Sequence, residues 1–360
     1  MKGYKAFNKG LVCRGKRYAE NTVFEEENAE ICKRGMHFCK NPLDVLDYYP
    51  LIDNEGNVTE FAEVEALDDV KTNDGKKFCT KRLKIGAKLS LWQFIKASFD
   101  VTYQNIKSQV EVSESARFAG DNNTKLIGGG YAKLVGGNYA ELIGGGCAKL
   151  AGGMYAKLVG GDCATLAGGT WAKLIGGDDA KLIGGDGAKL IGEYNAKLVG
   201  GNGATLAGGL NAKLVGGDCA KLVGDNYATL VGGNSAKLVG GNGATLAGGY
   251  DATIIGDDNT ELAGGDCAKI VGGNDATLAG GDCATLAGGN GTTLAGGYDA
   301  IIVGDNGSVA KGKKGSIIVL VERNNDMNIV NFKAAQVDGE KIKEDTLYKL
   351  EKGEFVEVEE

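Results

Sequence analysis

The stretch from Ala132 to Gly153 reads AKLVGGNYAELIGGGCAKLAGG, and it decides the fold. It repeats every eight residues: Ala, usually Lys or Thr, Leu, a small or β-branched residue, Gly, Gly, usually Asn or Asp, and a variable residue. This octad runs without insertion from Ala116 to Gly307 and occurs 24 times. Of the 61 glycines in the 360-residue chain, 50 lie in this segment. The chain is therefore built on an internal repeat with a different segment at each end.

Each octad predicts a short strand followed by a turn. Gly-Gly followed by Asn or Asp favours a turn, because these residues tolerate positive φ. A helix is disfavoured because each Gly costs about 1 kcal/mol against Ala in a helix interior, and no apolar stripe of helical period compensates. Such short strands need neighbours, and stacking them in register supplies these. The sequence thus predicts a mainly β fold, a β-solenoid of 24 octapeptide repeats.

Side chains alternate between the two faces of a strand, which predicts which positions point inward. The third-position leucines, beginning at Leu126, and the first-position alanines should form a thin core, with positions two and four outside. Octads with Lys at position two usually have Ile or Val at position four, and those with Thr at position two usually have Ala there. Either the two side chains are in contact, or duplication copied them together. Two or three octads per coil are both possible. The spacing of Glu193, Asp225, Asp257 and Asp305 by multiples of 16 favours two.

The outward second positions form the predicted binding surface. Octads 1 to 12 have a charge balance of +2 and octads 13 to 24 one of −7, so a lysine-rich row gives way to a threonine-rich one. The alternative is that these rows only keep the faces soluble. We also consider that this charge gradient is recognised by a partner protein, or by another copy of the chain in a head-to-tail or other homo-oligomer. The predicted binding residues are Lys125, Lys133, Lys149, Lys157, Lys173, Lys181, Lys189, Lys197, Thr245, Thr277, Thr285 and Thr293.

The flanks are predicted to cover the ends of the solenoid, because exposed strand edges recruit other chains. We expect an α+β N-terminal cap domain over residues 1–107, the solenoid over 108–315 and a β cap over 316–360. Alternating runs predict strands at Phe61–Ala66 and Arg82–Leu91, and Pro42–Tyr49 predicts a helical turn. SIIVLVE, from Ser316, and TLYKLEKGEFVEVEE, from Thr346, predict the strands of the C-terminal cap.

Composition sets further expectations. A net charge of −7 demands neither a nucleic acid nor a membrane, and no apolar run is long enough to cross one. The start, MKGYKAFNKG, carries no apolar stretch, so we expect no secretory signal and a cytoplasmic location. The nine cysteines are then reduced thiols.

No catalytic residue, metal site or cofactor is predicted. His37 lies near Cys39, with Cys13, Cys32 and Cys79 elsewhere in the segment, but the spacing fits no common zinc knuckle. A partly buried His37 with its hydrogen bonds satisfied is the simpler expectation. Five repeat cysteines occupy the variable eighth position and are expected at corners: Cys147, Cys163, Cys219, Cys267 and Cys283.

The Gly-Gly-Tyr-Asp-Ala stretches at Gly248 and Gly296 resemble the octapeptide of bacterial ice-nucleation proteins. That resemblance implies a solenoid with outward Thr rows that order water, but here Lys fills the second position in 12 octads and Thr in eight. GGNGATLAGG, from Gly240, is similar to the calcium-binding nonapeptide of secreted repeat toxins. It is one residue short, and Ala244 replaces the carboxylate that this family supplies, so no calcium site is expected.

The N-terminal segment resembles an uncharacterised domain that precedes Gly-rich repeats in bacteriophage and clostridial proteins. The motifs are GYKAFNKGLVCRG, GMHFCKNPLDVLDYYP and LKIGAKLSLWQF. The resemblance implies a phage or mobile-element origin, and a host cytoplasm as the location. We expect a non-enzymatic interaction or structural protein that binds a host or virion macromolecule, most simply a protein. The alternatives are a nucleic-acid mimic using the acidic half, an ice-binding solenoid, and an N-terminal enzyme on a solenoid scaffold.

Overall fold

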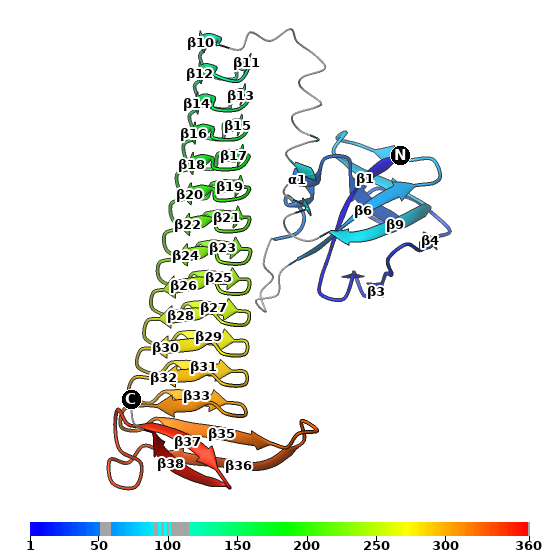
Figure 1. The fold of residues 1–360 in the computed structure, drawn as a ribbon. Helices are drawn as coiled ribbons and strands as arrows, with labels where there is room; N and C mark the ends of the chain where they lie inside the picture. The colour runs from blue at the N-terminus through cyan, green and yellow to red at the C-terminus, as the bar shows by residue number, and fades with distance from the viewer. Residues whose placement is uncertain (51–58, 90–92, 95–96, 99–100, 102–114, 359–360) are drawn as a thin grey trace. The chain divides into compact units, whose positions relative to one another are not determined.

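The computed structural model describes residues 1–50, 59–89, 93–94, 97–98, 101 and 115–358. The described part of its N-terminal region includes the short helix α1 (Pro42–Val45) and two antiparallel sheets (Figure 1). The strands are β1 (Lys2–Phe7), β2 (Val12–Cys13), β3 (Lys16–Arg17), β4 (Val23–Glu25), β5 (Met36–Cys39), β6 (Glu60–Ala66), β7 (Lys71–Thr72), β8 (Lys77–Thr80) and β9 (Arg82–Leu89).

Seven of these strands form one sheet in the order β4-β9-β6-β1-β5-β8-β7, while β2 and β3 pair as a hairpin. Phe7, Met36, Leu83 and Ile85 lie at the centre of its buried cluster. The predicted strand at Phe61–Ala66 is confirmed as β6, and that at Arg82–Leu91 as β9 up to Leu89, since residues 90 and 91 lie outside the described residues. The helix α1 supplies the predicted helical turn. Apart from α1 and a few helical residues after position 92, the described part of this region is β-structure and turns.

The repeats form two parallel sheets, and the mainly β, solenoidal fold is confirmed (Figure 1). In the first sheet the repeat strands are β10 (Arg117–Ala119), β12 (Lys133–Val135), β14 (Lys149–Ala151), β16 (Thr165–Ala167), β18 (Lys181–Ile183), β20 (Lys197–Val199), β22 (Lys213–Val215), β24 (Thr229–Val231), β26 (Thr245–Gly248), β28 (Glu261–Gly264), β30 (Thr277–Gly280), β32 (Thr293–Ala295) and β34 (Val309–Lys311). In the second they are β11 (Lys125–Ile127), β13 (Glu141–Ile143), β15 (Lys157–Val159), β17 (Lys173–Gly176), β19 (Lys189–Gly192), β21 (Thr205–Gly208), β23 (Lys221–Gly224), β25 (Lys237–Gly240), β27 (Thr253–Gly256), β29 (Lys269–Gly272), β31 (Thr285–Gly288), β33 (Ile301–Gly304) and β35 (Ile317–Arg323).

Successive octads alternate between the two sheets, so each coil holds two octads. The sequence left two and three octads open, and the structure decides for two. Each strand pairs in register with the strand 16 residues away, as Leu134 does with Leu150. The 26 strands from β10 to β35 therefore form 13 coils.

The predicted core is confirmed. The third-position side chain is buried from Leu134 onward, and the alanine that opens the octad is buried beside it, as Ala132 shows. Leu126 in the first coil is only half-buried. Because every coil contributes the same small and large side chains, the two sheets are joined by a narrow, uniform apolar core.

The glycine pairs were predicted to supply the positive φ of the turns, and this prediction is wrong. No fifth- or sixth-position glycine of the repeats has a positive φ; instead, 23 of the 24 eighth-position residues do, mostly non-glycines such as Cys219 at 57°. A Cβ on Gly208, at a fifth position, would lie 2.5 Å from the Cβ of Ala212. One on Gly217, at a sixth, would lie 2.2 Å from Oδ1 of Asn202. The pairs are therefore required by close packing at the corner rather than by backbone conformation.

Both strands of the last coil pair directly with strands of the C-terminal cap. β34 and β35 continue the parallel ladders, and Ser308 and Ser316 take the inward first position there. The predicted boundary between 315 and 316 thus falls inside the thirteenth coil. Antiparallel pairing then covers both sheets, with β36 (Ile329–Gln336) against β35 and the hairpin of β37 (Leu347–Glu351) and β38 (Glu354–Val358) against β34.

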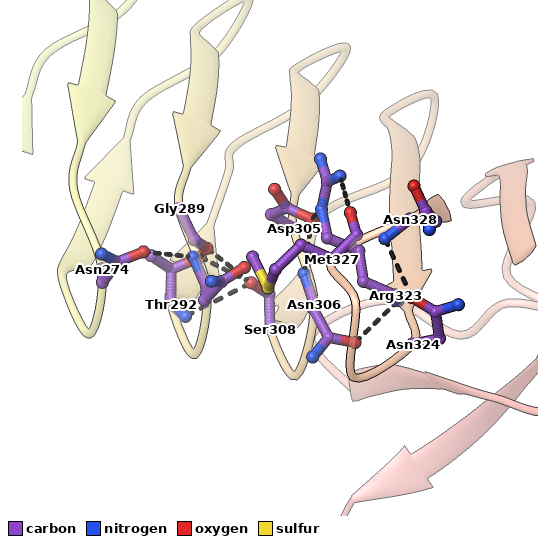
Figure 2. Close-up of polar contacts among 11 residues, drawn as sticks. Asn274, Gly289, Thr292, Asp305, Asn306, Ser308, Arg323, Asn324, Met327 and Asn328 are labelled. Atoms are coloured by element: carbon purple, nitrogen blue, oxygen red, sulfur yellow. Dashed lines mark hydrogen bonds and ion pairs between the residues drawn. The ribbon is translucent and has the colours of Figure 1, made fainter. Parts of the chain in front are cut away.

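Polar contacts tie the cap to the last coils (Figure 2). Nε of Arg323 donates to Asp305 at 2.7 Å, and its backbone N–H donates to Oδ1 of Asn306 at 3.0 Å. This bond to Arg323 holds the pKa of the Asp305 carboxyl below its usual value. Inside the coil, the hydroxyls of Thr292 and Ser308 are 2.8 Å apart and hydrogen-bonded, so the polar residues that replace Ala at position one are satisfied.

Candidate functional site

The twelve predicted binding residues all lie on outward faces, but they do not form one surface. Seven belong to the sheet that begins with β10, hereafter the first sheet: Lys133, Lys149, Lys181, Lys197, Thr245, Thr277 and Thr293. Five belong to the second sheet, which begins with β11: Lys125, Lys157, Lys173, Lys189 and Thr285. Any binding surface must therefore be assigned to one sheet.

The first eight strands of the first sheet, β10 to β24, present a surface that we call the basic face. It consists of their second and fourth positions. Arg117 and five lysines stand at second positions, and no acidic side chain occurs at either position. The lysines of the basic face are Lys133, Lys149, Lys181, Lys197 and Lys213.

Apolar side chains run beside these lysines on the basic face. Val135 is 51% exposed and Ile183 is 53% exposed, and Val199, Val215 and Val231 are also exposed. Single exposed apolar residues are ordinary, but a regular file of them along a flat sheet is typical of an interaction surface. The arrangement offers a partner both positive charge and apolar contact.

The second sheet has a different outer face. Glu141 interrupts its lysines and forms ion pairs with Lys157 at 2.9 Å and Lys125 at 4.0 Å. The hydrogen bond from Lys157 lowers the pKa of the Glu141 carboxyl below its usual value. Fourth-position residues of this sheet are buried from Ile143 to Val223, whereas Val135, Ile183, Val199, Val215 and Val231 on the first sheet are exposed. The second sheet therefore lacks a comparable free surface over this range.

The four predicted threonines form no continuous row. Thr285 is on the second sheet, and Glu261 lies between Thr245 and Thr277 on the first. The five repeat cysteines lie at corners, where they are exposed or half-buried, as the sequence predicted. Tyr139 and Tyr155 occupy the same eighth position and stack with ring centroids 5.1 Å apart.

A second candidate site is a cavity of about 400 Å³ in the N-terminal region, which we call the N-terminal cavity. Strands β1 and β5 form its floor, and the β2–β3 hairpin and α1 form its sides. Antiparallel pairing of β1 with β5 brings Lys5 to His37, and Nζ of Lys5 donates to the His37 carbonyl at 2.8 Å. Sγ of Cys13 and the hydroxyl of Tyr49 are 3.0 Å apart.

Lys5 is the unusual group in this cavity. Its side chain is buried, and burial lowers the pKa of the amine below its usual value, an effect that Cys13 partly opposes. The rings of Phe7 and Tyr18 lie 5.5 and 5.6 Å from Nζ. No carboxylate of the described residues forms an ion pair with it. A buried amine whose partners are a carbonyl, the Cys13 thiol and ring faces, with no carboxylate, is an incomplete site for a cation.

Three other titratable groups of the cavity, His37, Cys39 and Tyr49, are held in their neutral forms. Burial, together with Lys77, Lys5 and Arg14, lowers the pKa of His37 to about 4, and its Nε2 accepts a hydrogen bond from the backbone N–H of Cys32 at 2.9 Å. The expectation of a partly buried, satisfied histidine is therefore confirmed. Burial raises the pKa of Cys39 to about 12 and that of Tyr49 above its usual range. Arg14, Lys16 and Lys77 also line the cavity, together with one carboxylate, that of Glu26.

Sequence reasoning had grouped His37 with cysteines but had not found Lys5, Arg14 or Tyr18. Spacing gives no signal for them, because a lysine in a strand is usually exposed. Only the pairing of β1 with β5 reveals that Lys5 faces inward. Among the described residues, no group of three or more His, Cys, Asp or Glu side chains is arranged to hold a metal ion. No described helix is long and apolar enough to span a bilayer.

Comparison with known proteins gives one match. A family model described as "Domain of unknown function (DUF7666)" matches residues 1–97, so this part of the chain is similar to that family. The match includes every residue that lines the N-terminal cavity. No curated protein matches the chain significantly. No solved structure does so either.

Proposed function

We propose that the chain is a non-enzymatic interaction protein whose solenoid is a scaffold and whose basic face binds an acidic protein. The observation that supports this most directly is the combination of six cations, no acid and a file of exposed Val and Ile on one flat surface. In keeping with the resemblance of the N-terminal segment, the proposal places the chain in a phage or mobile element and its partner among host or virion proteins.

The chemistry of the basic face favours a protein over a nucleic acid. In-register pairing places Lys197 beside Lys213, and Val199 beside Val215, so charged and apolar files run parallel. A phosphate backbone would use the lysines but would leave the valines in water. An acidic protein surface with apolar side chains would use both files, and such interfaces combine apolar contact with complementary charge.

The acidic half of the solenoid is a weaker candidate for nucleic-acid mimicry. Carboxylate oxygens of Asp218, Asp266 and Asp282 accept hydrogen bonds from backbone N–H groups in the next coil. These acids thus have a structural role that accounts for their presence. The neighbours of Asp218 in the same ladder, Asn202 and Asn234, carry no charge.

The test uses the full chain as bait in nuclease-treated bacterial lysate, followed by purification of any retained protein. Its affinity is then measured by calorimetry for the wild type, for Lys181→Glu with Lys197→Glu, and for a matched pair on the second sheet, Lys221→Glu with Lys269→Glu. We expect the first pair to weaken binding about tenfold or more and the matched pair to leave it unchanged. Lysine-directed cross-links should map to the basic face.

Three results would contradict the proposal. Equal weakening by both pairs would show a response to net charge alone. Loss of every retained molecule after nuclease treatment would identify the ligand as nucleic acid. Cross-links confined to lysines outside the first sheet would likewise place the interface elsewhere.

A further inference from the structure

The N-terminal cavity has an excess of positive side chains in its lining. Four cationic side chains line it, against one acidic side chain, Glu26, which is already paired with Lys16. Three positive groups thus remain without a lining carboxylate. They are Lys5 at the floor, Arg14 in the β2–β3 turn and Lys77 at the start of β8.

Asp74, in the loop between β7 and β8, does not supply the missing charge. Oδ1 of Asp74 accepts hydrogen bonds from the backbone N–H groups of Lys76 and Lys77, each at 2.9 Å, and its other oxygen accepts one from the hydroxyl of Tyr48 at 3.3 Å. Asp74 does not line the cavity. Nζ of Lys5 donates to the His37 carbonyl and Nζ of Lys77 to Sγ of Cys32 at 3.9 Å, but among the described residues no carboxylate forms an ion pair with Lys5, Arg14 or Lys77.

We propose that the N-terminal cavity binds a small organic anion, with a phosphate or carboxylate group held by Lys5 and Arg14 and a planar ring held by the tyrosines. An anion at Lys5 would compensate a buried ammonium group. The guanidinium of Arg14 matches either anion, because its donors bind two oxygens at once. The low pKa of His37 is consistent with the positive potential that such a ligand would neutralise.

The aromatic lining defines the remainder of the ligand. Tyr18 lies beside Lys5, and Tyr48 is 43% exposed, with Nζ of Lys77 located 4.3 Å from the centroid of its ring. Tyrosine faces favour flat rings. A volume of about 400 Å³ suits a ring with one anionic substituent and is at the small end of ligand sites in proteins.

His37 is the only histidine of the chain and lines this cavity, so its imidazole reports on binding there directly. The experiment follows the ¹³C-labelled histidine of the full chain by NMR while phenyl phosphate, benzoate, inorganic phosphate or phenol is added. We expect saturable shifts with phenyl phosphate or benzoate in the millimolar range or below, weaker shifts with inorganic phosphate, and none with phenol. The tighter of the first two identifies the anionic group.

Variants test the assigned residues. Lys5→Met preserves the volume of the side chain and removes its charge, and Arg14→Gln does the same at the rim. Each should weaken binding about tenfold or more, whereas Lys9→Met, on an exposed residue outside the cavity, should not. Arg14→Gln also covers the case in which Lys5→Met does not fold. A bound anion should in addition raise the pKa of His37, which a purely structural effect would not do.

The proposal is overturned if neither phenyl phosphate nor benzoate shifts His37 at millimolar concentration. It is also overturned if phenol binds as tightly as phenyl phosphate, because the site would then recognise the ring alone. Unchanged affinity in both Lys5→Met and Arg14→Gln would place the anion elsewhere.

Discussion

Oδ1 of Asn202 accepts a hydrogen bond from the backbone N–H of Asp218, with 2.9 Å between the two atoms. The residues are 16 apart, so the bond joins consecutive coils at one corner of the solenoid. Asp218 repeats the contact with the N–H of Asn234 at 2.7 Å. Side chains at the seventh position thereby continue the interstrand ladder around the corner and satisfy backbone donors that the strands do not reach.

Loss of one such rung should weaken the coupling between two coils. We expect Asp218→Ala to lower the free energy of unfolding by about 1 kcal/mol, because the N–H of Asn234 loses its acceptor. Asp218→Asn keeps Oδ1 and should be neutral. The midpoint of denaturant unfolding, followed by circular dichroism, measures both. Thr170→Ala is the control, since Thr170 has the same position in the octad but its side chain forms no hydrogen bond with the described residues. An equal loss of stability there would refute the role of the side-chain bond.

The glycines at fifth positions should be intolerant of a methyl group. In Gly208→Ala the new Cβ would lie 2.5 Å from the Cβ of Ala212, so the corner must shift, and we expect a loss of about 1–3 kcal/mol. Gly130→Ala is the matched control, because its nearest neighbour would be 3.6 Å away and its φ is not positive. Thermal unfolding of the two variants distinguishes packing from conformation; similar losses would favour conformation.

The eighth position should be sensitive to branching at Cβ. Cys219 has a φ of 57°, which Asn adopts readily and β-branched residues do not. We therefore expect Cys219→Val to be about 1 kcal/mol less stable than Cys219→Asn, although both side chains are exposed at this corner. Unfolding midpoints of the two variants provide the measurement. Equal stability would mean that the corner relaxes out of the left-handed region.

The single histidine should titrate with a pKa of about 4. Its value in the unfolded chain is about 6.5, so above that pH both states are neutral and His37 contributes its full stability. As the pH falls from about 6.5 to 4, the unfolded state takes up the proton first and the domain loses stability. His37→Gln should remove this part of the pH dependence. NMR titration gives the pKa directly, and a midpoint near 6.5 would contradict the described environment.

The repeat itself was predictable because one pattern recurs 24 times and only stacking buries Leu134 and its equivalents. The role of the glycines was not predictable. A Gly pair looks the same in the sequence whether it is needed for a positive φ or for the close approach of neighbouring atoms. The distances from Gly208 to Ala212 and Leu214 resolve that question only once the corner is known.

The sequence predicted which positions of each octad face outward, but not which of these residues share one surface. Lys133 and Lys125 are equivalent in the octad, yet they lie on different sheets, because coil size decides which octads are neighbours. The N-terminal cavity was beyond prediction for a similar reason. Lys5, Cys13 and Tyr49 have no common spacing in the sequence, and only the folded domain brings them together in the lining of the cavity.

The alternation of octads between two sheets also constrains how this chain can lengthen. Thr165, Thr205, Thr245 and Thr285 recur every 40 residues, an odd number of octads. Thr165 and Thr245 consequently lie on the first sheet, and Thr205 and Thr285 on the second. Recombination by an odd number of octads exchanges the two sides for everything downstream, whereas an even number extends each side unchanged. Only the insertion or deletion of an even number of octads keeps every downstream octad on its original sheet, and so preserves an existing surface.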